Sequence, residues 1–498
     1  MQAEVAEREE ATGEARQVEQ IDTLIIGAGI SGIGAACHLT RECPGREFAI
    51  LEGRDAIGGT WDLFRYPGIR SDSDMFTFGY RFRPWTEGKD IADAPSILNY
   101  LRETMQEYDI EQKIRFGHRV QRLEWRSDLS QWLIDVLKSD GTRARIACNF
   151  LMTCTGYYDY AEGYRPEFPG EQDFNGQIVH PQHWPENLDY RGKRVVVIGS
   201  GATAVTLVPA MASDASHVTM LQRSPTYVFT RPAEDAIARW LRRLLPAKLA
   251  YKLTRGKNVL LSWYLYAISR RKPEKMREFL RNMAREELGD KIDVDKHFNP
   301  DYAPWDQRMC LIPDADLFRV LREGSASIET DHIERFTESG ILLKSGKSLE
   351  ADIIVTATGL KLQFLGGAEL LKDGEPVHAK DLVVYKGMML SNLPNLVAVF
   401  GYTNASWTLK ADLTCRYTCR LLNYMEEQGL RVVVPELDTE KFDTEPVIGL
   451  QSGYVHRAEG LLPKQGRAVP WRNRDNYIRD LLAIRFGKVE DEVLKFSR

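Results

Sequence analysis

The sequence lacks a hydrophobic run long enough to cross a membrane, and it lacks a large excess of charge of one sign. Lys and Arg number 66 against 71 Asp and Glu, which gives a net charge of -5. This balance gives no reason to expect nucleic acid as a partner. The apolar stretch NVLLSWYLYAI (258–268) has only eleven residues, whereas a membrane-spanning helix needs about 20.

Cysteine is also scarce, and the seven cysteines are scattered and odd in number. This disfavours a disulfide framework and fits a reducing cytoplasm, where we expect the protein to reside. His180 and His183 have no cysteine or carboxylate cluster at metal-ligand spacing, so we predict no metal site. Residues 1–20 are rich in Glu and Ala and have no apolar core. We therefore expect a disordered acidic leader and no signal peptide.

What the chain does have is a dinucleotide-binding pattern near its start. A short apolar run, a glycine-rich turn that opens a helix, and a strand with an acidic end follow one another: IDTLII (21–26), GAGISG (27–32) and FAILE (48–52). Gly27 makes the tight turn, Gly29 lets the backbone approach a pyrophosphate, and Gly32 lets the helix pack on the strand. Glu52 is then placed to accept a hydrogen bond from a ribose hydroxyl. This site is suited to FAD.

A second copy of the pattern begins at residue 194. Its strand, turn and second strand are RVVVIG (194–199), GSGATA (199–204) and HVTMLQR (217–223). Ala204 replaces the third glycine, and the second strand ends in Arg223 where the first copy has an acidic residue. A guanidinium binds a 2′-phosphate that a carboxylate would repel. The second site is therefore suited to NADPH.

The predicted fold is α/β, with two Rossmann-like dinucleotide-binding domains, for FAD and NADPH, and a helical insertion in the second. LRETMQEYDIEQKI (101–114) predicts one of the helices of the first domain. Strands at 150–156 and 352–359 end in glycine and suit chain crossings between the domains. The predicted boundaries are a disordered leader at 1–20, an FAD domain at 21–158 plus 361–498, an NADPH domain at 159–231 plus 299–360, and the insertion at 232–298.

The insertion combines the apolar stretch at 258–268 with flanking basic residues, among them Arg242, Arg243, Lys248 and Lys252. We favour a helical insert that packs against the cofactor domains. A basic amphipathic surface that makes peripheral contact with an anionic membrane is the alternative.

Three motifs make the chain resemble type I Baeyer–Villiger monooxygenases, which are class B flavoprotein monooxygenases. Between the two turns lies Phe174-x-Gly176-x-x-x-His180-x-x-x-Trp184-Pro185, and residues 58–72 match G-G-x-W-x-x-x-x-Y-P-G-x-x-x-D. The third motif is NPDYAPWDQRMCLIPDADLF (299–318). Strings such as HPQHWPE and GYTNASWTLKADL bring the chain closest to the ethionamide-activating subgroup of that family.

The resemblance implies tightly bound FAD, NADPH as hydride donor, O2 as co-substrate, and ketones or sulfur compounds as substrates. It implies Baeyer–Villiger oxidation of ketones to esters or lactones through a C4a-peroxyflavin, and sulfoxidation of thioethers or thioamides. Together with the two turns, it gives the predicted cofactor-binding residues: Gly27, Gly29, Ser31, Gly32, Glu52, Gly59, Thr60, Trp61, Leu63, Arg70, Ser71, Asp72, Val120, His180, Gly199, Ser200, Gly201, Ala202, Thr203, Ala204, Gln222, Arg223 and Ser224.

The predicted catalytic residues are Arg308 and Asp72. By position, Arg308 aligns with the family's arginine over the flavin, where a permanent cation keeps the C4a-peroxide anion nucleophilic and stabilises charge on its adduct. Asp72 would pair with Arg308 and hold its orientation. Many relatives carry a lysine where this chain has Gln307, so the NADPH phosphate should depend more on Arg223.

Two other functions stay open from the sequence. One is a flavin-containing monooxygenase that oxygenates only nitrogen or sulfur, and Trp184 argues against it because those proteins usually have Phe or Tyr there. The other is a nucleotide-binding redox sensor without catalysis. Arg308 and Asp72 argue against the sensor, which would need neither residue.

Overall fold

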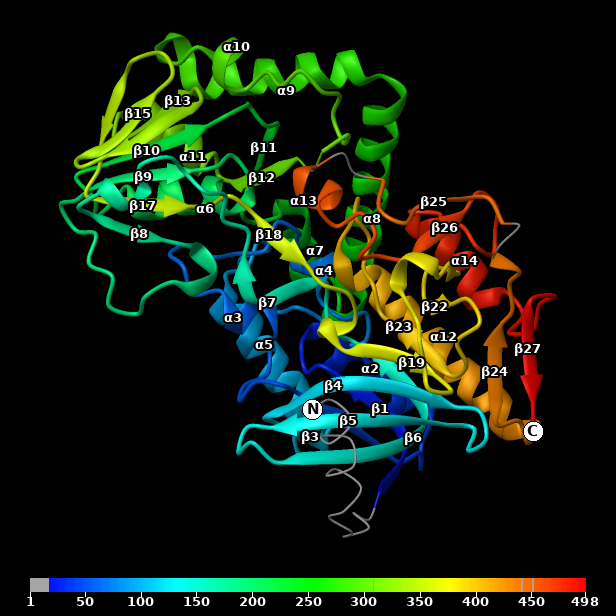
Figure 1. Ribbon diagram of the computed structural model, residues 1–498. Coiled ribbons are helices and arrows are strands. Elements are labelled where there is room, and N and C mark those ends of the chain that lie inside the picture. Colours follow the sequence, from blue (N-terminus) through cyan, green and yellow to red (C-terminus); the bar gives the residue numbers. More distant parts are fainter. Residues whose placement is uncertain (1–17, 308, 440–441, 450–451) are drawn as a thin grey trace, which may run out of the picture.

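Two sheets, each covered by helices, organise the chain in the computed structural model, which describes residues 18–307, 309–439, 442–449 and 452–498 (Figure 1). Each sheet carries one of the two glycine-rich turns at the carboxyl end of a parallel strand. The predicted α/β fold with two Rossmann-like units is therefore confirmed.

The first sheet has a parallel part and an antiparallel part. The parallel part lies in the order β3 (Ile114–Arg115), β2 (Phe48–Leu51), β1 (Glu19–Ile26), β6 (Arg143–Thr153) and β23 (Leu396–Ala398). The antiparallel part continues from β6 through β5 (Gln131–Lys138) to β4 (His118–Arg126), and β19 (Glu369–Lys372) and β20 (Glu375–Pro376) extend its edge. β2 is buried on both faces and reads as an unbroken apolar run, whereas β4 and β5 alternate.

The second sheet is wholly parallel. Its order is β13 (Ala326–Thr330), β10 (His217–Gln222), β9 (Arg194–Ile198), β17 (Ile353–Thr356) and β8 (Gln177–Val179). Helices α6 (Ala202–Met211) and α11 (Asp316–Glu323) pack on it, and the antiparallel strands β14 (Ile333–Thr337), β15 (Gly340–Leu343) and β16 (Ser348–Glu350) lie beside it. The motif at 174–185 between the two glycine turns, here called the linker fingerprint, lies at the edge of this sheet because β8 is its central part.

One antiparallel ribbon crosses between the sheets. It consists of β7 (Tyr158–Gly163), which follows β6, and β18 (Leu360–Leu362), which follows β17. These are the two crossings that the glycine-terminated strands predicted. After β18 the chain returns to the first sheet through β19 and β23. The later strands pair with one another, β24 (Val432–Pro435) with β27 (Leu494–Ser497) and β25 (Thr444–Pro446) with β26 (Lys464–Gly466).

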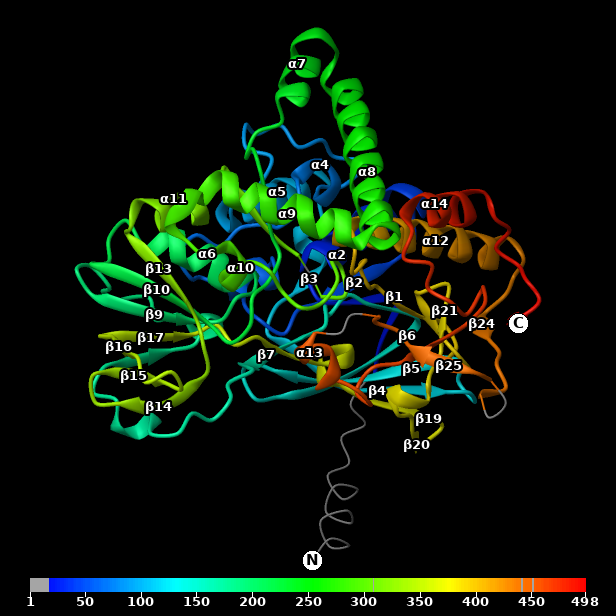
Figure 2. The same ribbon diagram turned by 90° about the horizontal axis from the view of Figure 1, so that it is seen from above.

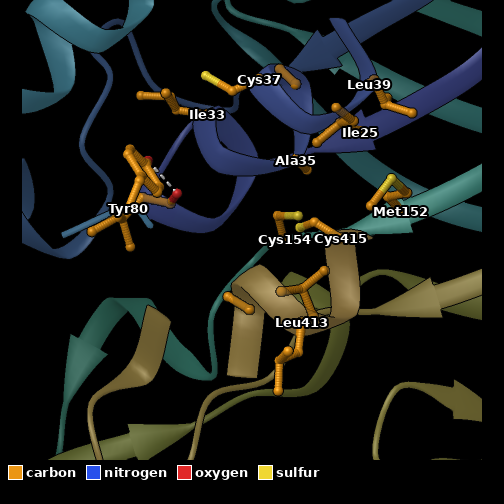
Figure 3. Packing of buried hydrophobic residues seen from close by; sticks show 14 of the residues in the cluster. Ile25, Ile33, Ala35, Cys37, Leu39, Tyr80, Met152, Cys154, Leu413 and Cys415 are labelled. Atoms are coloured by element: carbon orange, nitrogen blue, oxygen red, sulfur yellow. Dashed lines mark hydrogen bonds between the residues drawn. The ribbon is translucent and has the colours of Figure 1, made fainter. Parts of the chain in front are cut away.

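The main core lies between the first sheet and the helices that cover it. The glycine-turn helix α2 (Ile30–Glu42) packs against α12 (Trp407–Glu427), and Cys154 and Cys415 lie where the two helices meet the end of β6 (Figure 3). All seven cysteines are buried free thiols. Small sulfur-containing and aliphatic side chains allow this close approach of helix to helix.

The helix predicted at 101–114 is only half right. Helix α5 spans Ala94–Glu107, with Asp93 as its N-cap accepting from the Ser96 amide. It ends before Asp109, whose φ of 51° is left-handed and cannot continue a right-handed helix. The remaining predicted residues form a 3-10 turn and the short strand β3.

The predicted insertion consists of four helices: α7 (Ala236–Leu244), α8 (Ala247–Arg271), α9 (Pro273–Leu288) and α10 (Val294–His297). Helices α7 and α8 form a hairpin that projects from the rest of the molecule (Figure 2). In the part of the chain that the structure describes, no helix combines the length and the hydropathy needed to span a bilayer.

Candidate active site between the two glycine turns

The first glycine turn is shaped by backbone that leaves no room for side chains. Gly27 has a φ of +100°, and a β-carbon on it would lie 2.7 Å from the carbonyl oxygen of Cys154 at the end of β6. A β-carbon on Gly32 would lie 1.8 Å from the Gly27 carbonyl oxygen. Both positions therefore require glycine. The resulting turn brings the N-terminus of α2 to the carboxyl edge of the first sheet, where backbone N–H groups favour a phosphate.

Glu52 directly follows β2 and is buried beside this turn. Its two carboxylate oxygens accept hydrogen bonds from the backbone amides of Ala28 at 2.7 Å and Arg54 at 2.9 Å. A carboxylate offers about four acceptor positions, so these bonds orient Glu52 and still leave lone pairs for a ribose hydroxyl. Val120, also predicted as a contact, is buried in the neighbouring strand β4.

A cavity of about 230 Å³, the turn cavity, opens at the N-terminus of α2 and reaches the second turn. Many predicted cofactor residues line it: Gly29, Ser31, Gly59, Thr60, Trp61, Arg70, Ser71, Asp72 and Ala202. The two glycine backbones approach closely, because a β-carbon on Gly59 would lie 3.3 Å from the α-carbon of Gly29. Leu63, at the end of α3 (Thr60–Leu63), packs against the core of the second sheet. The cavity therefore has residues from both dinucleotide patterns on its walls.

Aromatic side chains that no motif indicated complete the wall of the turn cavity. They are Tyr157, Tyr158, Tyr160, Tyr402 and Trp407. The Trp407 indole donates a hydrogen bond of 2.8 Å to the Ser31 hydroxyl, and its ring stacks on that of Tyr157. The sequence signals for them are the run of tyrosines directly after Gly156 and the string GYTNASWTLKADL (401–413), which contains Tyr402 and Trp407.

The second glycine turn repeats the construction of the first. Gly199 has a φ of +142°, and its β-carbon would lie 2.3 Å from the carbonyl oxygen of Ala357 at the end of β17. A β-carbon on Gly201 would meet open space, so this backbone can be approached from outside. Ala204 takes the place of the third glycine and is fully buried in the first turn of α6. Ser200 and Thr203 flank the turn and are partly exposed.

The three predicted cofactor-binding residues at the end of β10 differ in exposure. The Gln222 amide is fully buried, donating to the His297 carbonyl and the Thr330 hydroxyl at 2.8 Å each. Its side chain therefore stabilises the core. Arg223 and Ser224 come next and are exposed at the carboxyl edge of the sheet, where an open α/β sheet binds its ligands.

Arg457 lies at the same edge, although no sequence motif pointed to it. Its guanidinium carbon is 3.4 Å from the centroid of the Tyr164 ring, and a β-carbon on Gly359, after β17, would lie 3.7 Å from its Nη2. Burial lowers the pKa of Arg457, and the positive charge of Arg223 lowers it further. Neither guanidinium has a carboxylate partner among the residues that the structure describes. Two cations therefore share one edge without an internal counter-ion.

The linker fingerprint holds the crossing ribbon. Gln182 donates to the Asp159 carbonyl at 2.8 Å, and the His183 ring bonds the Ala161 carbonyl at 3.0 Å. His180 packs on Gly163, where a β-carbon would lie 2.0 Å from the imidazole. Burial lowers the pKa of His180, and its Nε2 has no hydrogen-bond partner in the described chain. The linker fingerprint thus fixes β7 to the second sheet, and the His180 Nε2 is available to a bound ligand.

The two predicted catalytic residues have different outcomes. Arg308 lies outside the described residues. Asp72 lies on the loop between the sheets, where the Ser73 hydroxyl lies 3.4 Å from its carboxylate. Two residues earlier, Arg70 forms a partly buried ion pair with Asp316 at the start of α11, which joins the loop to the second sheet. Asp72 is therefore held at the junction of the two units.

A larger cavity of about 680 Å³, the apolar cavity, lies on the other side of Asp72, and most of its surface is carbon. Its walls come from α8 and α9 of the insertion and from β11 (Val228–Arg231) and β12 (Cys310–Pro313). It shares four lining residues with the turn cavity, and the two spaces meet there: Asp72, Ser73, Leu311 and Ala405. A molecule in the apolar cavity would therefore lie next to a group bound in the turn cavity.

Within the described residues, no three His, Cys, Asp or Glu side chains are placed to hold a metal ion. The turn cavity fits a flavin dinucleotide by three observations: a phosphate-sized glycine cradle, an oriented ribose acceptor in Glu52, and an aromatic wall. The exposed turn at Gly201 with Arg223 and Arg457 fits a phosphorylated nicotinamide dinucleotide.

Comparisons with known proteins agree with this geometry. Residues 89–430 match the flavin-binding monooxygenase-like family, and residues 25–92 match the NAD(P)-binding Rossmann-like domain. The FAD-containing monooxygenase EthA of Mycobacterium tuberculosis is 52% identical over 481 residues, covering 96% of this chain and 98% of the relative. The probable FAD-binding monooxygenase AlmA of Acinetobacter baylyi is 50% identical over 482 residues, covering 96% and 97%.

The fold is similar to that of a solved steroid monooxygenase bound to NADP. The TM-score is 0.74 at 21% identity, and the match covers 96% of this chain and all of the other. At this identity the likeness concerns the fold.

Proposed function

This chain belongs to the flavin-binding monooxygenase-like family, and on that premise we propose that it uses NADPH and O2 to insert oxygen beside the carbonyl of a ketone. The product is an ester or a lactone. The same site would oxidise the sulfur of thioethers or thioamides. The observation that carries the proposal is the meeting of the turn cavity with the apolar cavity at Asp72, Ser73, Leu311 and Ala405.

The described residues fit both cofactors. Gly27, Gly29 and Gly32 would hold the FAD pyrophosphate at the N-terminus of α2, and Glu52 would accept from its ribose. Gly201 and Arg223 would hold NADPH on the second sheet, with Arg457 as the added cation. FAD, when bound, supplies the hydride acceptor and the activation of O2.

The protein's own part in oxygen transfer is positioning and charge. Asp72 stands between the cofactor cavity and the substrate cavity, where a carboxylate can orient a guanidinium by paired hydrogen bonds. We propose Arg308 as that guanidinium, since it remains charged at any working pH and would stabilise negative charge that develops on oxygen. The aromatic wall with Trp407 excludes water from the same space.

The apolar cavity bears on the choice of substrate. Its volume of about 680 Å³ and its carbon surface suit a ketone or sulfide with a sizeable hydrocarbon part. We also propose that the enzyme works in the cytoplasm and touches a membrane peripherally through residues 232–298.

Product analysis tests the proposal directly. The purified protein, loaded with FAD, is incubated with NADPH and O2 and a panel of ketones, thioethers and amines, and the products are identified by mass spectrometry. We expect esters from apolar ketones and sulfoxides from thioethers. Oxygenation of amines or sulfides without any ester would favour a heteroatom oxygenase. NADPH consumption with no oxygenated product from any substrate would favour a redox sensor.

A further inference from the structure

We propose that helices α7 and α8 form a docking surface for an anionic lipid membrane, from which apolar substrate enters the apolar cavity. The inference rests on the proposed function for the identity of the substrate. The docking itself rests on the surface of the hairpin alone.

The hairpin exposes apolar side chains in two stripes. On α7, Ile237, Trp240 and Leu244 are spaced three and four residues apart and so share one face, with 59% of Trp240 and 60% of Leu244 exposed. On α8 a second stripe is formed by side chains four, seven and four residues apart, namely Leu249, Leu253, Leu260 and Tyr264. Exposed apolar residues scattered singly are ordinary, but a contiguous set on one projection marks an interaction site.

The charge of the same segment has one sign. Residues 236–273 contain ten Lys and Arg and no Asp or Glu, in a chain whose net charge is -5. Five of these cations have partners within the chain. Arg255 binds carbonyls of α4 (Met75–Phe78) and its surroundings, and Arg242 binds the Glu87 carbonyl. The other three form ion pairs with carboxylates, namely Lys257 with Asp235, Arg239 with Glu234 and Arg270 with Asp306. Others are exposed beside the apolar stripes, including Arg243, Lys248 and Lys252.

An apolar stripe with basic residues at its side matches an anionic bilayer surface. The apolar side chains can enter the boundary of the acyl chains while the basic ones stay among the phosphates. The shape agrees, because α7 and α8 project beyond both sheets, and no other element of the described chain covers the tip of the hairpin (Figure 2). A second copy of this chain would present ten further cations to the same surface and so fits it less well.

The hairpin is continuous with the apolar cavity. Ile237 of α7, Leu261 of α8 and Phe279 of α9 each line the cavity and are each about half exposed. The same helices therefore face solvent on one side and the cavity on the other. A hydrophobic molecule dissolved in the membrane would reach Asp72 without crossing bulk water.

Vesicle binding by the holoenzyme tests the docking surface. We expect sedimentation with phosphatidylglycerol vesicles, little with phosphatidylcholine vesicles, and release by 0.5 M NaCl. The variant Arg243→Glu, Lys248→Glu, Lys252→Glu should bind phosphatidylglycerol at least about a hundredfold more weakly, since each basic residue strengthens binding about fivefold. The variant Trp240→Ser, Leu244→Ser, Leu253→Ser should bind at least about tenfold more weakly.

Matched controls carry the same changes on other faces. Arg102→Glu, Lys344→Glu, Lys380→Glu changes the charge equally, and Leu482→Ser, Phe486→Ser removes exposed apolar side chains from α14 (Tyr477–Phe486). The proposal is wrong if these controls lose as much binding as the hairpin variants, or if the wild type binds neither lipid. The proposal is also overturned if the wild type does not bind vesicles and light scattering shows that it is a dimer whereas the hairpin variants are monomers. A second copy of the chain would then be the occupant of this surface.

Substrate delivery is measured separately. With a long-chain methyl ketone carried in phosphatidylglycerol vesicles, the wild type should react at least about tenfold faster than the apolar hairpin variant, following their difference in binding. With butanone in water, both should oxidise NADPH and form ester at the same rate. Equal rates on the vesicle-borne ketone would refute the route. If the wild type binds vesicles but oxygenates neither ketone, the docking surface is supported and the proposed function is wrong.

Discussion

The guanidinium carbon of Arg457 lies over the ring of Tyr164, 3.4 Å from its centroid, at the edge of the second sheet that also carries Arg223. Stacking on an aromatic ring holds a guanidinium in one orientation while leaving its N–H groups free to bind in their own plane. The two arginines repel each other, and a phosphate between them would remove that repulsion.

We therefore predict that Arg457→Ala raises the KM for NADPH by roughly tenfold to a hundredfold, which is the effect of one charge-assisted phosphate contact. Arg223→Ala should do the same, and neither should change the KM for NADH by a comparable factor. The measurement is steady-state NADPH and NADH oxidation by each variant. Arg467→Ala, an exposed arginine paired with Asp443, is the control. If the KM values for NADPH and NADH rise by the same factor, these side chains do not bind the 2′-phosphate.

The two glycine turns should be separable by substitution. Gly32→Ala places a methyl group 1.8 Å from a backbone oxygen under the first turn, so this variant should be purified without flavin and without its yellow colour. Gly199→Ala should stay yellow, because its clash with Ala357 lies at the second turn, but NADPH should no longer bleach it. Absorbance spectra before and after addition of NADPH check both. Gly256→Ala, which meets open space on α8, should behave as the wild type.

Arg308 should separate hydride transfer from oxygen transfer. Reduction of the flavin creates no negative charge on oxygen, whereas oxygen insertion does, and losing a preorganised charge partner costs about 10²–10³ in rate. Arg308→Ala should still be reduced by NADPH in stopped-flow measurements, but ester formation should be lost and the NADPH consumed should appear as hydrogen peroxide. Arg308→Lys should rescue little, since a single ammonium cannot form the paired bonds to Asp72. Near-normal ester yield from the Ala variant would remove Arg308 from the mechanism.

The pair of helices that covers the first sheet should lose stability at alkaline pH. Burial alone would lower the pKa of His38, but hydrogen bonds of 2.9 Å to Asp412 of α12 and Glu42 of α2 raise it to about 9. In the unfolded chain it returns to about 6.5. The contribution of His38 to the free energy of unfolding is therefore complete below about pH 6.5 and is lost as the pH rises through about 9. The free energy of unfolding should fall by roughly 3 kcal/mol over this range.

The test compares the free energy of unfolding of wild type and His38→Gln between pH 6 and pH 10. The difference between the two proteins should be largest near pH 6 and should shrink towards pH 10. His456→Gln, at an exposed histidine, serves as the control and should show no such trend. A difference that does not change with pH would mean that His38 is neutral in the fold.

The sequence predicted those parts of the fold that depend on local pattern. The order of strand, glycine turn and helix placed β1 and α2 within a few residues, because tight turns and buried strands each demand particular residue types at fixed spacing. The end of α5 could not be predicted in this way. It depends on the left-handed backbone of Asp109, a conformation that an aspartate adopts only in certain contexts.

In the candidate site, too, residues of local motifs could be predicted and residues brought in by tertiary packing could not. Gly29, Thr60 and Asp72 belong to compact motifs and were predicted as neighbours of a cofactor. Trp407 and Arg457 reach the site through tertiary packing from segments hundreds of residues away. No periodicity links Trp407 to Ser31 or Arg457 to Tyr164, so only the folded chain brings them together.

The ribbon of β7 and β18 also has a mechanical meaning. Each strand starts at most two residues after the glycine that leaves one sheet, Gly156 in the first and Gly359 in the second, and pairing joins Leu360 to Gly163 and Leu362 to Tyr158. The chain exits of both sheets are thus joined by one paired ribbon. A rotation of one sheet relative to the other would have to twist this ribbon or break its pairing. The ribbon therefore resists independent movement of the two cofactor sites.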